Sequence, residues 1–85
     1  MQSARDFLNE MSKEFKTDSF QWHFLGELRD AINEEAILSE RQQFFVYTKV
    51  TSIFSKPVTV KGDVDADIES YEMTLSLATY INSCR

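Results

Sequence analysis

Hydrophobic side chains recur at helical spacing in the first 40 residues of the chain. Phe7, Leu8, Met11 and Phe15 fall on one side of a helix, which predicts a helix over residues 4–16. A second, broader stripe predicts another helix over about residues 19–37. Its members are Phe20, Phe24, Leu25, Leu28, Ala31 and Ile32. Ser3 precedes the first stripe, and Asp18 and Ser19 precede the second, as expected of residues that cap helix N-termini.

The pattern becomes ambiguous after Gln42. The stretch FFVYTKVTSIF is rich in β-branched and aromatic residues, which favours a strand over residues 43–54. A helix is the alternative, because Ser39 and Gln42 have the spacing of a capping box. Val46, Val50, Ile53 and Phe54 would then share one helical face. We expect the strand.

Strict alternation of apolar and polar residues follows Pro57. Val58, Val60, Val64, Ala66 and Ile68 alternate with polar residues, and the phase shifts by one residue before Tyr71, Met73, Leu75 and Leu77. Alternation of this kind is typical of strands with one wet face. A helix that begins near Asp67 is the alternative. The predicted fold is therefore α+β, with two N-terminal helices packed on a three-stranded antiparallel meander. A small all-α bundle is the alternative fold, and residues 1–85 are expected to form a single small domain.

The composition indicates the cellular compartment in which the protein is expected. Cys84 is the one cysteine, so no internal disulfide can form and a reducing compartment is expected. The N-terminal residues lack the basic segment and apolar run of a secretory signal. The longest apolar run, residues 44–47, is far too short to span a bilayer. We expect a cytoplasmic protein without a membrane partner.

Charge is distributed unevenly along the chain. The net charge is −5, but residues 41–62 contain four basic and no acidic side chains, whereas the segments on both sides are acidic. Nucleic acids and anionic membranes are bound mainly by basic surfaces. An acidic chain therefore predicts a protein partner with a basic surface, and no direct binding of nucleic acid.

The stretch GDVDADIESYE places Asp63, Asp65, Asp67 and Glu69 at every second position. An EF-hand that started at Asp63 would need Gly where Ile68 stands and Glu where Thr74 stands, so a calcium loop is not expected. On a strand the four carboxylates would share one face. That face is either solvated or docks a basic partner.

The sequence lacks the residue patterns of the common metal sites and catalytic sites. His23 is the single histidine, and one remote cysteine does not complete a zinc site. Two glycines, Gly26 and Gly62, do not make a phosphate-binding loop. No nucleophile is paired with a base in a known motif. We expect a protein that is not an enzyme and that holds no metal or cofactor.

The tripeptide Asp18-Ser19-Phe20 is similar to the Asp-Ser-Leu motif of acyl carrier proteins. That resemblance implies a phosphopantetheine arm on Ser19. The chain departs from the family because one short helix precedes the motif and the long first loop is missing. Helix capping by Ser19 is the competing explanation.

These patterns together predict a small binding protein of the inhibitor, immunity or regulatory type that occupies a basic site on a protein partner. Trp22 is the expected anchor, because tryptophan is favoured at interface centres. The candidate binding residues are Asp63, Asp65, Asp67, Glu69, Trp22, Glu27, Asp30 and Glu34. A self-associating subunit, such as a homodimer formed through an unpaired sheet edge, is the alternative.

Overall fold

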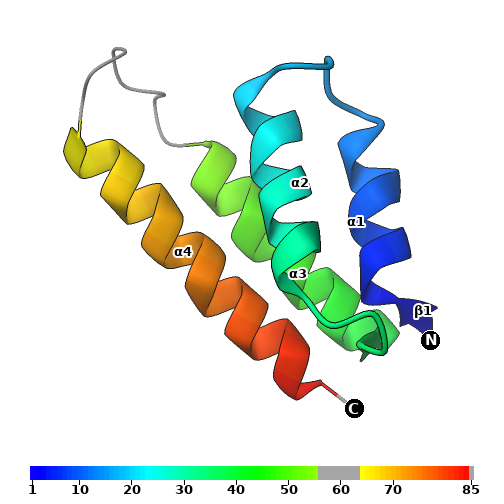
Figure 1. The fold of residues 1–85 in the computed structure, drawn as a ribbon. Coiled ribbons are helices and arrows are strands. Elements are labelled where there is room, and N and C mark those ends of the chain that lie inside the picture. Colours follow the sequence, from blue (N-terminus) through cyan, green and yellow to red (C-terminus); the bar gives the residue numbers. More distant parts are fainter. Residues whose placement is uncertain (56–63, 85) are drawn as a thin grey trace.

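A computed structural model describes residues 1–55 and 64–84, with residues 64–70 described by their backbone alone. This part of the chain is mainly helical (Figure 1). The elements, in chain order, are β1 (Gln2–Ser3), α1 (Ala4–Ser12), α2 (Phe20–Ala31), β2 (Ile37–Leu38), α3 (Glu40–Phe54) and α4 (Val64–Ser83).

The predicted three-stranded meander is wrong, and the described residues support the helical alternative. The segment expected as a strand at 43–54 lies in α3, and the alternating segment after Val64 lies in α4. In α3, Val46, Val50 and Ile53 are the buried residues, which is helical spacing. The β-branched composition of α3 was overridden by tertiary burial of one helical face. Residues 56–63, which begin the alternation, lie outside the described residues.

The start of α3 shows why a helix forms there. The Ser39 hydroxyl accepts the backbone N–H of Gln42 at 3.3 Å, and the Gln42 side chain accepts the backbone N–H of Ser39 at 2.8 Å. This reciprocal capping box satisfies two donors that a helix N-terminus otherwise leaves without partners. The capping-box spacing of Ser39 and Gln42 was therefore the sequence feature that correctly indicated a helix here.

The first two helices were predicted correctly, but both end earlier than expected. α1 ends at Ser12 and not at residue 16, and α2 ends at Ala31 and not near residue 37. Ser19 caps α2 by accepting the backbone N–H of Trp22 at 3.2 Å. Ser3 occupies the N-cap position of α1 without a side-chain cap hydrogen bond.

Two short strands hold the N-terminus against the segment between α2 and α3. β1 and β2 pair antiparallel, with Gln2 opposite Leu38 and Ser3 opposite Ile37. The backbone N–H of Ala4 extends this contact by donating to the carbonyl of Ala36 at 2.9 Å. This pairing places α1 beside the beginning of α3.

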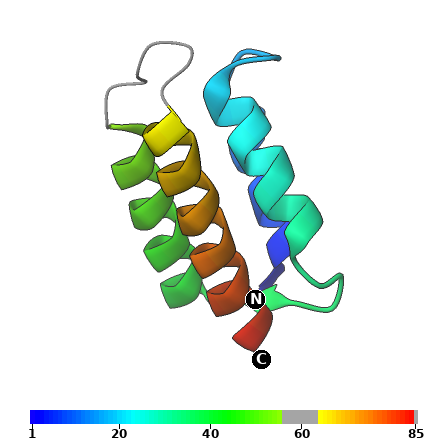
Figure 2. The same ribbon diagram turned by 60° about the vertical axis from the view of Figure 1, so that its left-hand side comes forward.

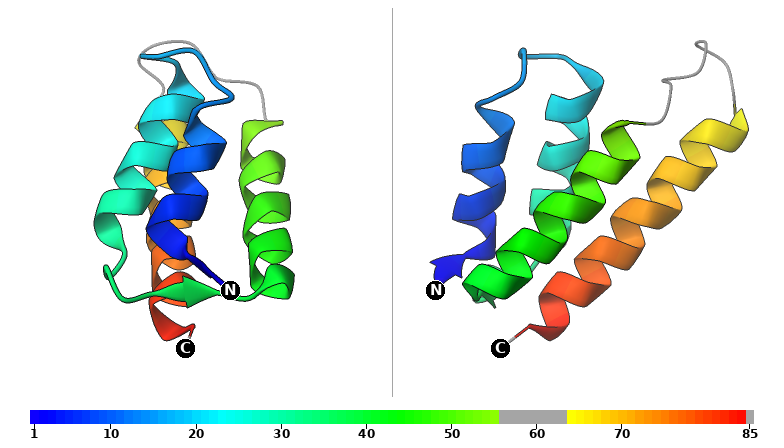
Figure 3. Two further views of the ribbon diagram at one scale, coloured as in Figure 1. Left: turned by 90° about the vertical axis from the view of Figure 1, so that its right-hand side faces the viewer. Right: turned by 180° about the vertical axis from the view of Figure 1, so that it is seen from behind.

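The helices form two antiparallel hairpins, α1–α2 and α3–α4, which pack on one another (Figures 2 and 3). α2 also contacts α4, and these two helices run in the same direction. The largest fully buried side chains come from all four helices and the α2–α3 connection. They are Leu8, Leu25, Leu28, Ile32, Leu38, Ile81, Val46 and Val50.

An aromatic cluster closes the core at the end where α3 finishes. The centroid of the Phe54 ring lies 5.4 Å from that of Phe15, 6.1 Å from that of Phe20 and 5.5 Å from that of Phe24. All three pairs are edge-to-face. Such edge-to-face pairs are favoured by the ring quadrupole. The cluster ties α3 to α2 and to the α1–α2 connection.

Candidate functional site

The acidic stretch after Gly62 does not have the geometry that the sequence predicted. Asp63 lies outside the described residues, and positions 65, 67 and 69 belong to the α4 backbone. Positions 65 and 69 are about one turn apart and share a side of the helix, whereas position 67 lies about 200° around the axis from position 65, so the three do not share one face as they would on a strand. A docking role for these acids stays a prediction. It was based on a strand with all four carboxylates on one face, and the structure has a helix there.

The structure brings together three of the other predicted residues, Trp22, Glu27 and Asp30. They line a shallow depression of about 220 Å³ along α2, with Gly26 between them and Ser12 of α1 at the edge. Trp22 is half-buried, whereas Glu27 and Asp30 are exposed. An aromatic side chain and two carboxylates therefore face the same small hollow, which we call the α2 depression.

Gly26 leaves the α2 depression open. A Cβ atom placed on Gly26 would meet only the Arg29 Nη2 atom, at 3.9 Å, which is ordinary van der Waals contact. Close packing therefore does not require glycine at this position. The missing side chain instead leaves room beside Trp22 and Glu27 for a group from outside.

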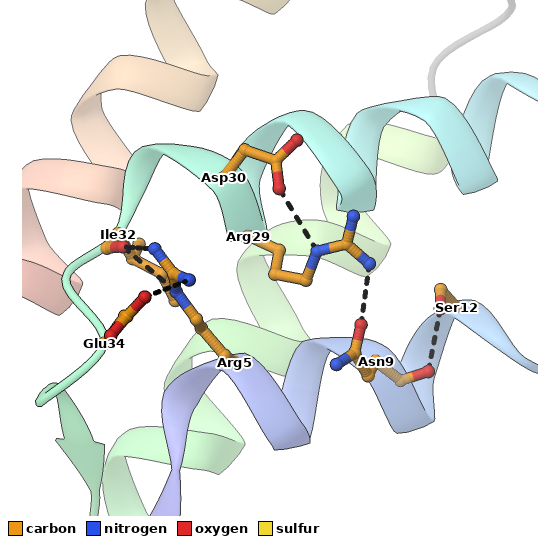
Figure 4. Close-up of polar contacts among 7 residues, drawn as sticks. All are labelled: Arg5, Asn9, Ser12, Arg29, Asp30, Ile32 and Glu34. Atoms are coloured by element: carbon orange, nitrogen blue, oxygen red, sulfur yellow. Dashed lines mark hydrogen bonds and ion pairs between the residues drawn. The ribbon is translucent and has the colours of Figure 1, made fainter.

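Arg29 lines the α2 depression, and its contacts to α1 and to Asp30 can be followed in Figure 4. Its Nη1 atom donates to Asn9 Oδ1 of α1 at 2.7 Å, and its Nε atom donates to Asp30 Oδ1 at 3.3 Å. The Asp30 side chain stays 75% exposed in this pair. Because exposed ion pairs are weak and readily exchange partners, the Asp30 carboxylate remains available to a stronger cation.

Trp22 also contacts its neighbour His23, whose ring lies edge-on at 5.0 Å between centroids. The His23 Nε2 atom is 3.6 Å from Asp18 Oδ1 at the start of α2. Asp18 itself adopts a left-handed backbone with φ of 69°, which Asp tolerates better than most residues. The loop before α2 therefore positions His23 beside Trp22.

Glu34 is separated from the α2 depression because α2 has already ended. It lies in the α2–α3 connection, where its carboxylate is 3.5 Å from Arg5 Nη1 (Figure 4). Arg5 also donates to the carbonyl of Ile32, at 2.8 Å from Nη2 and 3.3 Å from Nε. Glu34 and Asp30 line a second, larger hollow of about 820 Å³ with Arg5 and Asn82.

Sequence reasoning missed a groove between α3 and α4. Phe45, Lys49 and Ile53 of α3 line it with Met73, Leu77 and Tyr80 of α4, and its volume is about 390 Å³. The rings of Phe45 and Tyr80 lie 4.7 Å apart. Reading residues 43–54 as a helix would have separated the inward Val46 and Val50 from the Phe44–Phe45 pair. The capping box at Ser39 was the signal that could have revealed the groove.

Tyr80 is the one described group with a clearly shifted pKa. Partial burial raises the pKa of its phenol above the ordinary value of 10.0, and the neighbouring Cys84 adds to this effect. The positive charge of Arg41 opposes the shift. The Cys84 thiol, which is buried, donates to the carbonyl of Tyr80 at 3.3 Å.

Ser19 has a structural role at the position where an acyl-carrier-like arm would attach. Its hydroxyl oxygen is the N-cap acceptor of α2. Modification of Ser19 stays a prediction. In the part of the chain that the structure describes, no three His, Cys, Asp or Glu side chains are grouped to hold a metal ion.

Residues 1–55 and 64–84 contain no helix with the length and apolar composition needed to cross a bilayer. In comparisons with known proteins, the chain matches no family model, no curated protein and no solved structure.

Proposed function

We propose that this chain is a small binding protein of the inhibitor, immunity or regulatory type, which docks a protein partner through the α2 depression. The observation that carries the proposal is the placement of Trp22, Glu27 and Asp30 around one hollow. A partner that offers a Lys or Arg side chain fits this chemistry. An aromatic face attracts a cation, and two carboxylates accept its N–H donors.

The charge of the surrounding surface supports the same partner. Residues 1–39 contain eight acidic and four basic side chains. A surface of that sign accelerates the approach of a basic protein and orients it before contact. Trp22 then supplies the desolvated anchor that charge alone does not provide. In this proposal the protein acts by occupying a basic site on its partner.

Retention of proteins from a host lysate on the immobilised chain tests the proposal. We expect a basic partner to be retained by the wild type and lost on the double variant Glu27→Lys/Asp30→Lys, which reverses both charges. Glu10→Lys is the matched control, because Glu10 is exposed on α1 and does not line the α2 depression. If Glu10→Lys removes the partner as fully as the double variant, general charge and not the depression is responsible.

Fluorescence gives a second measurement on the purified complex. Trp22 is the one tryptophan of the chain, so its emission reports directly on the α2 depression. Binding should shift that emission, and log Kd should rise with log salt less steeply in the double variant than in the wild type. An unchanged Trp22 emission on binding would exclude this site.

A further inference from the structure

His23 lies at the α2 depression and has no part in the function proposed above. Its ring packs edge-on against Trp22 at 5.0 Å between centroids, and His23 lines the same hollow as Trp22, Glu27 and Asp30. The His23 side chain is 60% exposed, so water reaches the imidazole directly. The hollow therefore contains a group that can take up or release a proton where the partner's cation would sit.

Protonation of His23 would change the charge of the α2 depression. The other charged residues that line it are Glu27, Asp30 and Arg29, and α1 contributes Ser12, which carries no charge. Two carboxylates and one guanidinium leave one net negative charge around a neutral imidazole. Carboxylates and guanidinium groups ordinarily keep their charge between about pH 5.5 and 7.5, whereas an imidazole changes its charge in that range. A proton on His23 would therefore cancel the net charge of the hollow.

Two acidic neighbours would keep a protonated His23 ring beside Trp22. Asp18, in the α1–α2 connection, has its Oδ1 atom 3.6 Å from His23 Nε2, a contact that becomes an ion pair when the ring is charged. Glu27 follows His23 by four positions, so the two are neighbours on the surface of α2. The charged ring would thus stay next to the indole and the carboxylate that a cationic side chain of the partner would use.

We propose that the charge state of His23 controls cation binding in the α2 depression, so that the partner binds at neutral pH and is released at mildly acidic pH. This inference rests on the proposed function, because it takes a Lys or Arg side chain of the partner as the occupant. Two positive charges in one small hollow repel each other, and the imidazolium also competes for Glu27. By linkage, binding of the cation displaces the proton from His23.

The first measurement that tests this proposal needs no partner. Trp22 is the one tryptophan and His23 the one histidine of the chain, so the pH dependence of Trp22 emission reports on their contact. A charged imidazole in contact with an indole ring quenches its emission. We expect the emission of the wild type to fall between about pH 7.5 and 5.5 and that of His23→Gln to stay constant. Equal pH profiles in the two chains would overturn the proposal, because the His23 ring would then not contact Trp22.

The second measurement uses N-acetylarginine amide, whose single positive charge does not change in this pH range. Titration followed by Trp22 emission at constant ionic strength should give a Kd that is about three- to tenfold higher at about pH 5.5 than at about pH 7.5, because two unit charges repel each other at a protein surface. In His23→Gln the two Kd values should agree, since glutamine keeps a polar side chain that does not titrate. Circular dichroism at both pH values establishes that both chains are folded.

The contrary outcomes distinguish a failure of this inference from a failure of the proposed function. A wild-type Kd that is the same at both pH values, with binding lost in Glu27→Lys/Asp30→Lys, would overturn the role of His23 and leave the cation site intact. A pH dependence of Kd that persists in His23→Gln would also overturn the role of His23, since another group would then be responsible. No binding of N-acetylarginine amide at either pH would overturn both, because the α2 depression would then take no cation.

Discussion

The side-chain amide of Asn82, in the last turn of α4, terminates α2 by bonding to the residues on both sides of its end. Its Oδ1 atom accepts the backbone N–H of Asn33 at 2.8 Å, and its Nδ2 atom donates to the carbonyl of Ala31 at 3.4 Å. Ile32, between them, is extended, and its carbonyl accepts from Arg5. Side chains from α1 and α4 thus supply the partners that the end of α2 lacks.

Asn82→Ala should lower the free energy of unfolding by about 0.5–1.5 kcal/mol, because both hydrogen bonds are lost at a partly exposed site. Urea denaturation measures the change. Ser83→Ala is the matched control, since the neighbouring Ser83 hydroxyl donates within α4, to the carbonyl of Tyr80. Equal losses in the two variants would show that Asn82 has no special role at the end of α2.

Ser39→Ala should destabilise the protein by about 1 kcal/mol, because it removes the side-chain acceptor of the α3 capping box. Ser3→Ala provides the comparison. Ser3 stands at the N-cap of α1 without a side-chain cap bond, so its substitution should change the urea midpoint little. A larger loss in Ser3→Ala than in Ser39→Ala would contradict the capping geometry.

Phe54→Ala should lower the free energy of unfolding by about 2–4 kcal/mol, because the Phe54 ring contacts three other phenylalanine rings of the aromatic cluster. Phe44→Ala deletes the same atoms from an exposed position of the same helix and should change stability by less than about 0.5 kcal/mol. Thermal or urea unfolding at low protein concentration separates the two. Similar losses of unfolding free energy in the two variants would mean that α3 presents a different side to the core.

The stability of the protein should fall as the pH rises above about 10. The pKa of Tyr80 is raised in the folded state, so the unfolded chain loses this proton first. At such pH the folded state binds more protons than the unfolded state, and stability therefore decreases with rising pH. Tyr80→Phe should make the loss less steep in urea midpoints measured between about pH 8 and pH 11. Tyr47→Phe, at an exposed position of α3, should leave the slope unchanged.

Gly26→Ala should stabilise the protein by about 0.5–1 kcal/mol, because alanine favours a helix more than glycine does and the new Cβ makes no close contact. Chemical denaturation tests this prediction. A destabilised variant would show that the backbone around Gly26 packs more tightly than the Arg29 contact indicates. The same variant should retain the partner, since a methyl group fills little of the α2 depression.

Three of the candidate binding residues, Trp22, Glu27 and Asp30, lie within one helix, α2. Periodicity placed all three on α2, and Glu27 and Asp30 are neighbours on a helix surface because they are three positions apart. Trp22 is five positions from Glu27, so it is the structure that shows all three lining one depression. Glu34 lies outside the α2 depression because α2 ends before it, and no local pattern reveals the contacts of Arg5 and Asn82 at that end. The α3–α4 groove was missed for a related reason. Its lining residues belong to two segments that were expected to be strands.

The sequence by itself determined the first two helices, the cap at Ser19, and the acidic character of the first half of the chain. These features depend on residues close together in sequence, where spacing and hydrogen-bonding chemistry are sufficient. Only the tertiary structure decided that residues 40–54 and 64–83 are helices. Their β-branched and alternating patterns fit either conformation, and the choice was made by burying Val46, Val50, Leu77 and Ile81 against α1 and α2. A locally ambiguous segment adopts whichever conformation removes more apolar surface from water, and that depends on the shape of the rest of the core.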